Sequence, residues 1–252
     1  MLIDSPRLTR RDREHWEIME SLDQAYALAR AARLRRLERD AVTSLRSFFN
    51  AGAGYIGVSW GKDSVVVAHL AHLARVDAPL VAIRAGPLVS PECDQVRDRF
   101  IADHPGVEYH EIRVDCQPDP DDRDGWHQTG TLERGFAKAA ERFGDRYTSG
   151  VRAAESSGRS RRMRAYGCAT GRTLAPIGWW RTEDVFAYAH WRGLPLHPAY
   201  AMSDGGAMDR ARLRVSFLTL RTGEGRGKRE WENRYYGDRL AELRAMARRV
   251  AG

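Results

Sequence analysis

The chain has 252 residues, 42% of them hydrophobic, and its 41 basic and 34 acidic residues give a net charge of +7. This length is sufficient for one large domain with a substantial core. No segment approaches the roughly 18 consecutive apolar residues of a membrane span or the apolar stretch of a signal peptide, so we expect a cytoplasmic protein that does not enter a membrane.

Residues 11–50 are predicted to be helical, because apolar residues recur every three to five positions with charges between them. From residue 55 onward, short apolar runs alternate with helical patterns. This alternation predicts an α/β fold with a doubly wound, mostly parallel sheet, an N-terminal helix and a C-terminal helical extension. The predicted strands span residues 55–59, 80–84, 107–113, 147–151 and 174–177. The predicted helices between them span residues 62–75, 91–103, 131–143 and 182–192.

Beyond Pro198 the chain becomes rich in glycine and arginine. Segment 223–228 is interpreted either as a lid that brings Lys228 or Arg226 onto a bound phosphate, or as a flexible linker. A C-terminal helix is predicted at residues 229–249. We therefore divide the chain into an N-terminal helical region, a nucleotide-binding α/β domain and a C-terminal loop-and-helix region, with bounds 1–50, 51–200 and 201–252.

The most informative segment is the end of the first predicted strand. The apolar run 55–58 stops at Ser59-Trp60-Gly61-Lys62-Asp63-Ser64, and an apolar helical pattern begins at Val65. A strand that ends in such a loop and opens a helix is a phosphate cradle. The glycine admits the anion to the backbone, the helix N-terminus presents N–H groups to it, and Lys62 adds a positive charge.

Lysine is rare in this chain, which makes Lys62 more informative. Of the 41 basic residues only three are lysines, Lys62, Lys138 and Lys228. This preference for arginine is typical of a codon bias, so the arginine count alone is weak evidence for nucleic-acid binding. The net positive charge nevertheless favours anionic partners, such as nucleotides, sulfate or nucleic acid.

The loop does not match a Walker A motif, which requires Gly, four residues and then Gly-Lys-Ser/Thr. Ile56 stands where the first glycine should be, and Asp63 stands where the hydroxyl residue should be. The segment instead resembles the PP-loop, Ser-Gly-Gly-Lys-Asp-Ser, with Trp60 in place of one glycine. That loop belongs to the ATP pyrophosphatase superfamily, which includes sulfate adenylyltransferase small subunits and phosphoadenylylsulfate (PAPS) reductases.

Three further segments resemble signatures of the PAPS reductase and sulfate adenylyltransferase branch. After the second strand, Gly86 and Pro91-Glu92 match the family pattern, whereas Arg84 and Ala85 do not. Segment 149–159 resembles Gly-Ile-Arg-x-x-Glu-Ser-x-x-Arg, and segment 176–200 resembles Pro-Ile-x-x-Trp…Leu-Pro-x-x-Pro-Leu-Tyr. The four partial matches, in this order, cover more than half of the chain.

Segment 149–159 also has a direct chemical interpretation. Arg152 and Arg159, just past a strand end, are suited to clamp phosphate or sulfate oxygens, while Glu155 orients one arginine or supports Mg²⁺. A surface cluster of Arg/Glu ion pairs is the alternative interpretation of the same residues.

The resemblance implies ATP and Mg²⁺ as cofactors. It also implies transfer of AMP to an anionic acceptor, either sulfate, a sulfonucleotide or nucleic acid, with release of pyrophosphate. It implies roles in catalysis for Lys62, Asp63, Arg152, Glu155 and Arg159, with Asp63 also a Mg²⁺ ligand. Nucleotide contacts are expected from Ser59, Trp60, Gly61, Lys62, Asp63, Ser64, Gly86, Gly150 and Lys228. A partner subunit or a homo-oligomer is compatible with this chemistry.

The C-terminal Glu-Cys-Gly-(Leu/Ile)-His tail of PAPS reductases is absent, since no cysteine follows Cys168. Nor do the three cysteines include a C-x-x-C pair, which argues against a disulfide framework, a cysteine-rich zinc site or a cysteine-ligated iron–sulfur cluster. Two alternatives stay open. One is a sulfonucleotide reductase that uses Cys93, Cys116 or Cys168. The other is a non-enzymatic subunit of a DNA- or RNA-sulfur modification complex, which binds nucleic acid through residues 30–39 or 159–164.

Overall fold

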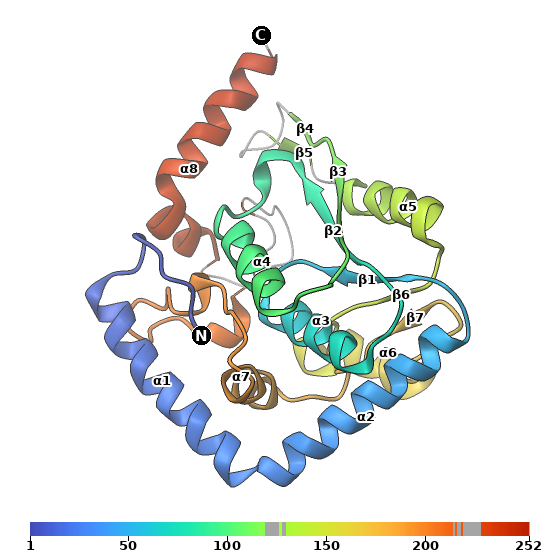
Figure 1. Ribbon diagram of the computed structural model, residues 1–252. Helices are drawn as coiled ribbons and strands as arrows, with labels where there is room; N and C mark the ends of the chain where they lie inside the picture. The colour runs from blue at the N-terminus through green and yellow to red at the C-terminus, as the bar shows by residue number, and fades with distance from the viewer. Residues whose placement is uncertain (119–125, 128–129, 214, 216–217, 219–227, 252) are drawn as a thin grey trace.

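The computed structural model describes residues 1–118, 126–127, 130–213, 215, 218 and 228–251. It confirms the predicted α/β fold, a five-stranded parallel sheet with helices on both faces (Figure 1). The strand order is β3-β2-β1-β6-β7, and every neighbouring pair is parallel. The strands are β1 (Tyr55–Val58), β2 (Leu80–Ala85), β3 (Tyr109–Val114), β6 (Tyr147–Thr148) and β7 (Thr173–Leu174).

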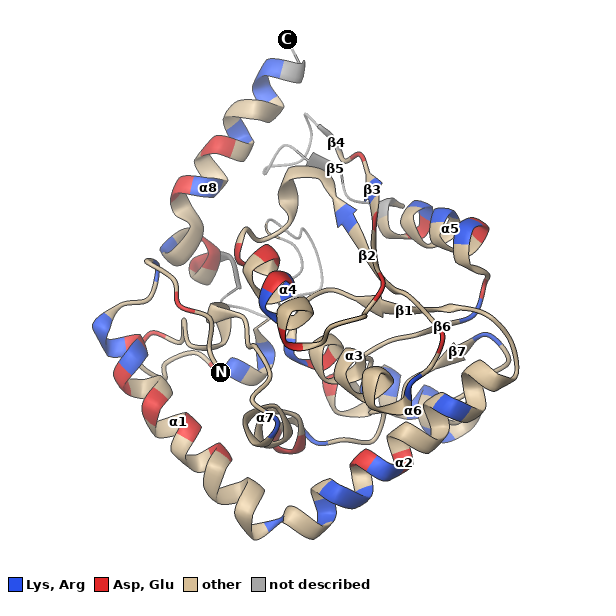
Figure 2. Ribbon diagram, in the orientation of Figure 1, with Lys and Arg blue, Asp and Glu red and all other residues tan. Residues whose placement is uncertain are grey.

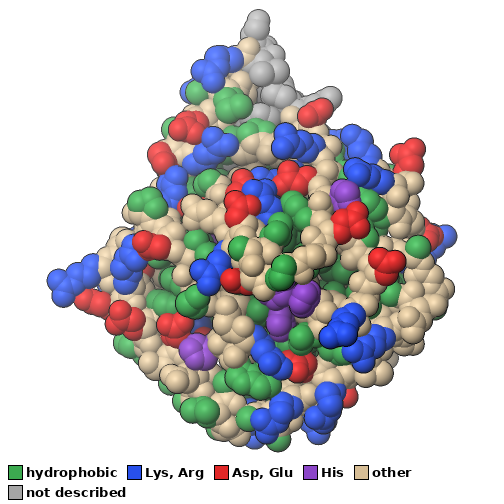
Figure 3. Space-filling model, in the orientation of Figure 1, with side chains coloured by type: hydrophobic (Ala, Val, Ile, Leu, Met, Phe, Trp, Pro, Cys, Tyr) green, Lys and Arg blue, Asp and Glu red, His purple; other side chains and the backbone are tan. Residues whose placement is uncertain are grey.

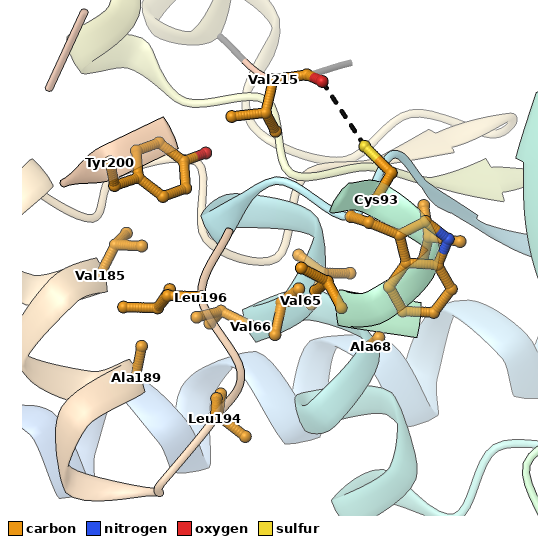
Figure 4. Close-up of a cluster of buried hydrophobic side chains, with 14 of the residues drawn as sticks. Val65, Val66, Ala68, Cys93, Val185, Ala189, Leu194, Leu196, Tyr200 and Val215 are labelled. Atoms are coloured by element: carbon orange, nitrogen blue, oxygen red, sulfur yellow. Dashed lines mark hydrogen bonds between the residues drawn. The ribbon is translucent and has the colours of Figure 1, made fainter. Parts of the chain in front are cut away.

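Helix α3 (Lys62–Ala74) follows β1 and is the central helix of the molecule. Ten of its 13 residues are buried, which suits a helix that is apolar on nearly every side. Helix α2 (Ala31–Asn50) packs against one side of α3 and helix α7 (Thr182–Trp191) against another. Figure 4 shows Val65 and Val66 of α3 facing Val185 and Ala189 of α7, with the chain segment of Leu194 and Leu196 between the two helices.

Helix α5 (Thr131–Phe143) lies on the sheet face opposite to α3 and α4 (Glu92–Asp103) (Figure 1). It covers β2 and β3, where Ala139 joins Val81, Ile112 and Val114 in a small second core cluster. The large core on the other face includes residues from α1, α2, α3, α4, α7 and α8. Side chains from all three predicted regions of the chain therefore share one core.

The N-terminal helical region is two helices rather than one. Helix α1 (Arg10–Ala29) and helix α2 (Ala31–Asn50) meet at Arg30, whose φ of −117° and ψ of 22° break the helix. The two arms form a V around the lower part of the molecule (Figure 1), and α1 packs against α7 (Thr182–Trp191) while α2 packs against α3. The break follows from packing on two differently oriented helices, because neither glycine nor proline occurs near it.

Several smaller elements complete the fold. The strands predicted at 147–151 and 174–177 are shorter than expected, and the basic segment after the first of them folds into a short 3₁₀ turn and a helix. The C-terminal helix has a kink at Tyr236, where φ is −128°. These elements are β4 (Gln117–Pro118), β5 (Trp126–His127), α6 (Ser157–Tyr166), α8 (Lys228–Ala251) and the 3₁₀ turns η1 (Gly86–Leu88), η2 (Ala153–Glu155), η3 (Pro198–Tyr200) and η4 (Arg210–Arg212).

Most charged residues are exposed or half-buried, and Figure 2 marks several basic positions along helix α6. Within the described residues, no helix combines the length and the apolar character needed to span a bilayer.

Three buried histidines, His69, His104 and His197, have a pKa lowered by burial. His104 donates Nδ1–H to the carbonyl of Phe100 at 2.8 Å, so its Nε2 accepts from Nδ1–H of His69, also at 2.8 Å. Burial lowers the pKa of His69 to about 4 and that of the fully buried His197 to about 3. Protonation of either ring would place a charge in the core.

We expect the free energy of unfolding to fall as the pH is lowered from 6.5 toward 4. Below pH 6.5 the unfolded chain takes up protons on His69 and His197 that the folded chain does not, so stability is lost with acidification. Each histidine contributes a loss of about 2 kcal/mol between pH 6.5 and pH 5. Urea unfolding at the two pH values measures the change. His69→Gln should remove the contribution of His69, about 2 kcal/mol, and an unaltered pH dependence in that variant would contradict the assignment.

Candidate functional site

The candidate site lies at the carboxyl edge of the sheet, between β1 and β6. From β1 the chain builds outward to β2 and β3 on one side and to β6 and β7 on the other. The loops that leave β1 and β6 therefore diverge, which opens a crevice at this topological switch point. The PP-loop-like segment 59–64 follows β1, and segment 149–155 follows β6.

This crevice is a pocket of about 1180 Å³, large enough for a nucleotide and part of an acceptor. It brings together most of the site residues predicted from the sequence. The predicted residues in its wall are Ser59, Trp60, Gly61, Lys62, Asp63, Ser64, Gly150, Arg152, Glu155 and Arg159.

Two predicted contacts lie elsewhere. Gly86 starts the turn η1 with φ of 49° and is not among the residues of the pocket wall. Lys228 is the first residue of α8, and its side chain lies outside the described part of the chain, as does segment 221–227.

Glu92, which belongs to the Pro-Glu motif match, is buried at the start of α4 and contacts Ser90, Arg7 and Tyr236. It therefore anchors the two ends of the chain to the core.

The loop after β1 is closed by its own two serines. The backbone N–H of Ser59 donates to Oγ of Ser64 at 3.1 Å, and that hydroxyl donates to the carbonyl of Gly61 at 3.0 Å. Gly61 is the N-cap of α3, so the loop curls around the helix N-terminus, where unpaired N–H groups and the helix dipole favour an anion.

Lys62, Asp63 and Arg152 form a buried charge cluster at this helix terminus. Oδ2 of Asp63 lies 2.7 Å from Nζ of Lys62, and its Oδ1 lies 2.6 Å from Nε of Arg152. The side chains of Lys62 and Arg152 are only 4% and 1% exposed. Two cations against one carboxylate leave a net positive charge with little water around it, which an anionic ligand would neutralise.

Glu155 and Arg159 extend this cluster toward the pocket mouth. Oε2 of Glu155 accepts from the backbone N–H of Arg152 at 2.8 Å and from the guanidinium of Arg159. Arg159 is the more exposed of the two arginines, with 35% of its side chain accessible. Glu155 thus couples the backbone before η2 to the first turn of α6.

Asp63 does not fit the role of a dedicated magnesium ligand, because both of its oxygens are engaged by cations. Within the described residues, no group of three or more Asp, Glu, His or Cys side chains could hold a metal ion. The hydrogen bonds from Arg152 and Arg159 both go to Oε2 of Glu155, so they do not engage its Oε1. A magnesium ion here would take most of its ligands from substrate phosphates and water, as is usual for this ion.

Tyr200 is a site residue that the sequence analysis assigned only to the fold. Its hydroxyl accepts the backbone N–H of Lys62 at 2.9 Å, and its ring centre lies 5.3 Å from the lysine Nζ. Burial raises the pKa of Tyr200, so the hydroxyl keeps its proton and can donate it to a bound anion. The signal was its place in the Leu-Pro…Tyr motif, 138 positions after Lys62.

Trp60 adopts a left-handed backbone conformation with φ of 60°, a conformation that favours glycine, the residue at this position of the PP-loop that the segment resembles. Its side chain is 1% exposed and lies against the rings of Phe100 and Tyr109, with centroid distances of 5.7 and 5.5 Å. The indole therefore anchors the loop to α4 and β3, and this packing holds Trp60 in its strained backbone conformation.

Replacing Trp60 with glycine is expected to destabilise the protein by roughly 2–4 kcal/mol. Relief of the left-handed conformation stabilises by about 1 kcal/mol, while loss of a buried tryptophan costs about 3–5 kcal/mol. Urea denaturation measures the difference, with Trp179→Ala at a half-exposed tryptophan as the control. A variant as stable as the parent would show that backbone strain outweighs packing here.

A scan against protein-family models and a search of curated proteins both give no match to this chain. Among solved structures, NMN synthetase from Francisella tularensis is similar, with a TM-score of 0.51 and 15% identity over 85% of this chain and 94% of that one. The U34-tRNA thiolase NcsA from Methanococcus maripaludis, with its [4Fe-4S] cluster, has a TM-score of 0.41 and 14% identity over 83% of this chain and 79% of that one. The first likeness confirms the fold class.

Proposed function

We propose that this chain is a PP-loop ATP pyrophosphatase, which binds ATP with Mg²⁺ and transfers AMP to an acceptor with release of pyrophosphate. The observation that carries the proposal is the buried Lys62–Asp63–Arg152 cluster at the N-terminus of α3, inside the pocket at the switch point. The fold shared with a synthetase and the motif resemblance support it.

The loop after β1 would hold the β- and γ-phosphates. Backbone N–H groups of the first turn of α3 and the Nζ of Lys62 would bind their oxygens, with the hydroxyl of Tyr200 as a further donor. Mg²⁺, when bound with ATP, would neutralise phosphate charge, and Glu155 is the carboxylate of this cluster that would help to hold it. Asp63 would keep Lys62 and Arg152 oriented before the nucleotide arrives.

In the reaction, an acceptor oxygen attacks the α-phosphorus, and the bond from this phosphorus to the α,β-bridging oxygen breaks. Pyrophosphate leaves with the bonding electron pair. Arg152 and Arg159 would stabilise charge on the acceptor side, while Lys62 stabilises the leaving group. Positioned cations and N–H donors are sufficient for this chemistry, so the chain needs no nucleophilic side chain.

The resemblance to the PAPS reductase and sulfate adenylyltransferase branch favours a role in sulfur metabolism or sulfur insertion. A sulfonucleotide reductase is the less favoured member of that branch. Cys93 is 1% exposed and donates to the carbonyl of Val215 at 3.5 Å, as the dashed line in Figure 4 marks. Burial raises the pKa of Cys93 to about 12, which keeps its sulfur in the unreactive thiol form at neutral pH.

The position of the label released from ATP tests the proposal. The protein is incubated with ATP labelled either at the α- or at the γ-phosphate, together with sulfate, RNA or DNA. Adenylyl transfer predicts that the γ-label leaves as pyrophosphate and that the α-label appears on the acceptor. Release of the γ-label as inorganic phosphate would contradict it, and so would the absence of ATP binding by calorimetry.

A further inference from the structure

Almost all of the net charge of this chain comes from one short segment. Residues 156–182 contain six arginines and no acidic residue, a net charge of +6 over 27 positions. The other 225 residues carry 35 basic and 34 acidic side chains and are nearly neutral. A codon bias explains arginine in place of lysine, but it does not explain why carboxylates are missing here.

On the face shown in Figure 3, basic and acidic side chains are intermixed, as is usual for a solvated surface. Segment 156–182 differs in this respect. Within the described part of the chain, Arg161, Arg162 and Arg164 of α6 are exposed and form no ion pair. Only Met163 of this helix is buried.

The arginines of α6 begin at the pocket and lead away from it. Arg159 belongs to the pocket wall, and Arg162 and Tyr166 follow it at i+3 and i+7, which places the three on one helix face. This face is about 10 Å long at 1.5 Å per residue. Tyr166, at its far end, is 74% exposed.

A second exposed aromatic side chain lies beside α6. Gly178 packs so closely on the helix that a Cβ there would lie 2.5 Å from Sγ of Cys168 and 3.2 Å from Sδ of Met163. The next residue, Trp179, is 51% exposed. Arg162 and Tyr166 therefore share a helix face with Arg159 of the pocket wall. Arg161 and Arg164 lie on the outer side of the same exposed helix, and Trp179 lies beside it.

We propose that residues 156–182 form a docking surface for single-stranded nucleic acid, which delivers the acceptor group to the pocket. This inference rests on the proposed function and names the substrate class of the same site. Arg161, Arg162 and Arg164 contact phosphates, and Tyr166 and Trp179 stack on bases.

The surface fits a single strand better than a duplex or a small anion. An aromatic ring can stack only on a base that is not enclosed in a helix, and only an unpaired nucleotide can enter the pocket. Sulfate alone would need Arg152 and Arg159 but none of the arginines farther out. A chain of phosphates uses all of them.

Fluorescence anisotropy of labelled 12-nucleotide RNA, DNA and duplex DNA, with the full chain and without ATP, tests the proposal. We expect a single strand to bind at least about ten times more tightly than the duplex, and the better of the RNA and DNA strands identifies the sugar. Arg161→Ala with Arg162→Ala should weaken binding at least about tenfold and reduce the slope of log K against log salt by roughly 1.4, about 0.7 for each phosphate that is no longer neutralised. Tyr166→Ala should weaken binding about fivefold or more without changing that slope.

The matched control is Arg248→Ala with Arg249→Ala, an exposed arginine pair at the far end of α8 that removes the same charge. The control should bind within about twofold of the parent. Any of four results would overturn the proposal. The two double variants lose the same affinity, duplex DNA binds as tightly as a single strand, no oligonucleotide binds, or polyglutamate competes as effectively as a single strand. The Arg161/Arg162 variant should still bind ATP. If the parent protein binds ATP but no nucleic acid, the docking surface is rejected and the proposed function is not. If the parent protein does not bind ATP, the proposed function is rejected.

Discussion

Replacing Lys62 with alanine is expected to lower kcat/KM for ATP by about 100- to 1000-fold, the usual effect of removing one preorganised charge donor. The Nζ of Lys62 lies in a site where little water can substitute for it, since only 4% of the side chain is exposed. Its loss also leaves Asp63 with Arg152 as its single cationic partner, so less positive charge remains to meet the pyrophosphate.

Lys138→Ala is the matched control, because Lys138 is an exposed lysine on α5 that is not among the residues of the pocket wall. Pyrophosphate release and calorimetric ATP binding should both be unchanged in this control. The thermal unfolding midpoint of each variant separates loss of function from loss of fold. A Lys62→Ala protein that is folded and as active as the parent would rule out this lysine as a phosphate ligand.

Gly150→Ala is expected to weaken ATP binding and turnover by about 100-fold while the protein stays folded. A Cβ at Gly150 would lie 2.8 Å from the carbonyl carbon of Asp63 and 3.0 Å from the backbone nitrogen of Ser64. These are backbone atoms of the phosphate loop, so the methyl group can be accommodated only if the loop moves. A displacement of about 1 Å at a catalytic site is sufficient for an effect of this size.

Gly158→Ala provides the control for this substitution. Gly158 is at the start of α6, and the nearest atom to an added Cβ is Oγ of Ser156 at 3.9 Å, an ordinary separation. The control should retain full ATP binding and should gain slightly in stability from the better helix propensity of alanine. Equal ATP affinity in the Gly150→Ala and Gly158→Ala proteins would show that the close approach at Gly150 does not position the loop.

The order of strands and helices could be predicted because hydrophobic period is a local property of the sequence. The helix over residues 131–143 was predicted with the bounds that the structure shows. The break at Arg30 could not be predicted, because it results from packing α1 and α2 on two helices of different direction. Strand β6 ends early for a related reason, since the chain after Thr148 leaves the sheet to form the site.

The sequence by itself determined the phosphate loop, because its glycine, lysine and serines act through local backbone geometry. Only the tertiary structure decided how distant residues contact this loop, and it added Tyr200 to the site. Arg152 reaches Asp63 across 89 positions, and Tyr200 reaches Lys62 across 138. It also explained Trp60, whose left-handed backbone is held by the packing of its ring on Phe100 and Tyr109. Such contacts depend on how strands and helices are arranged in space, which no local pattern in the chain records.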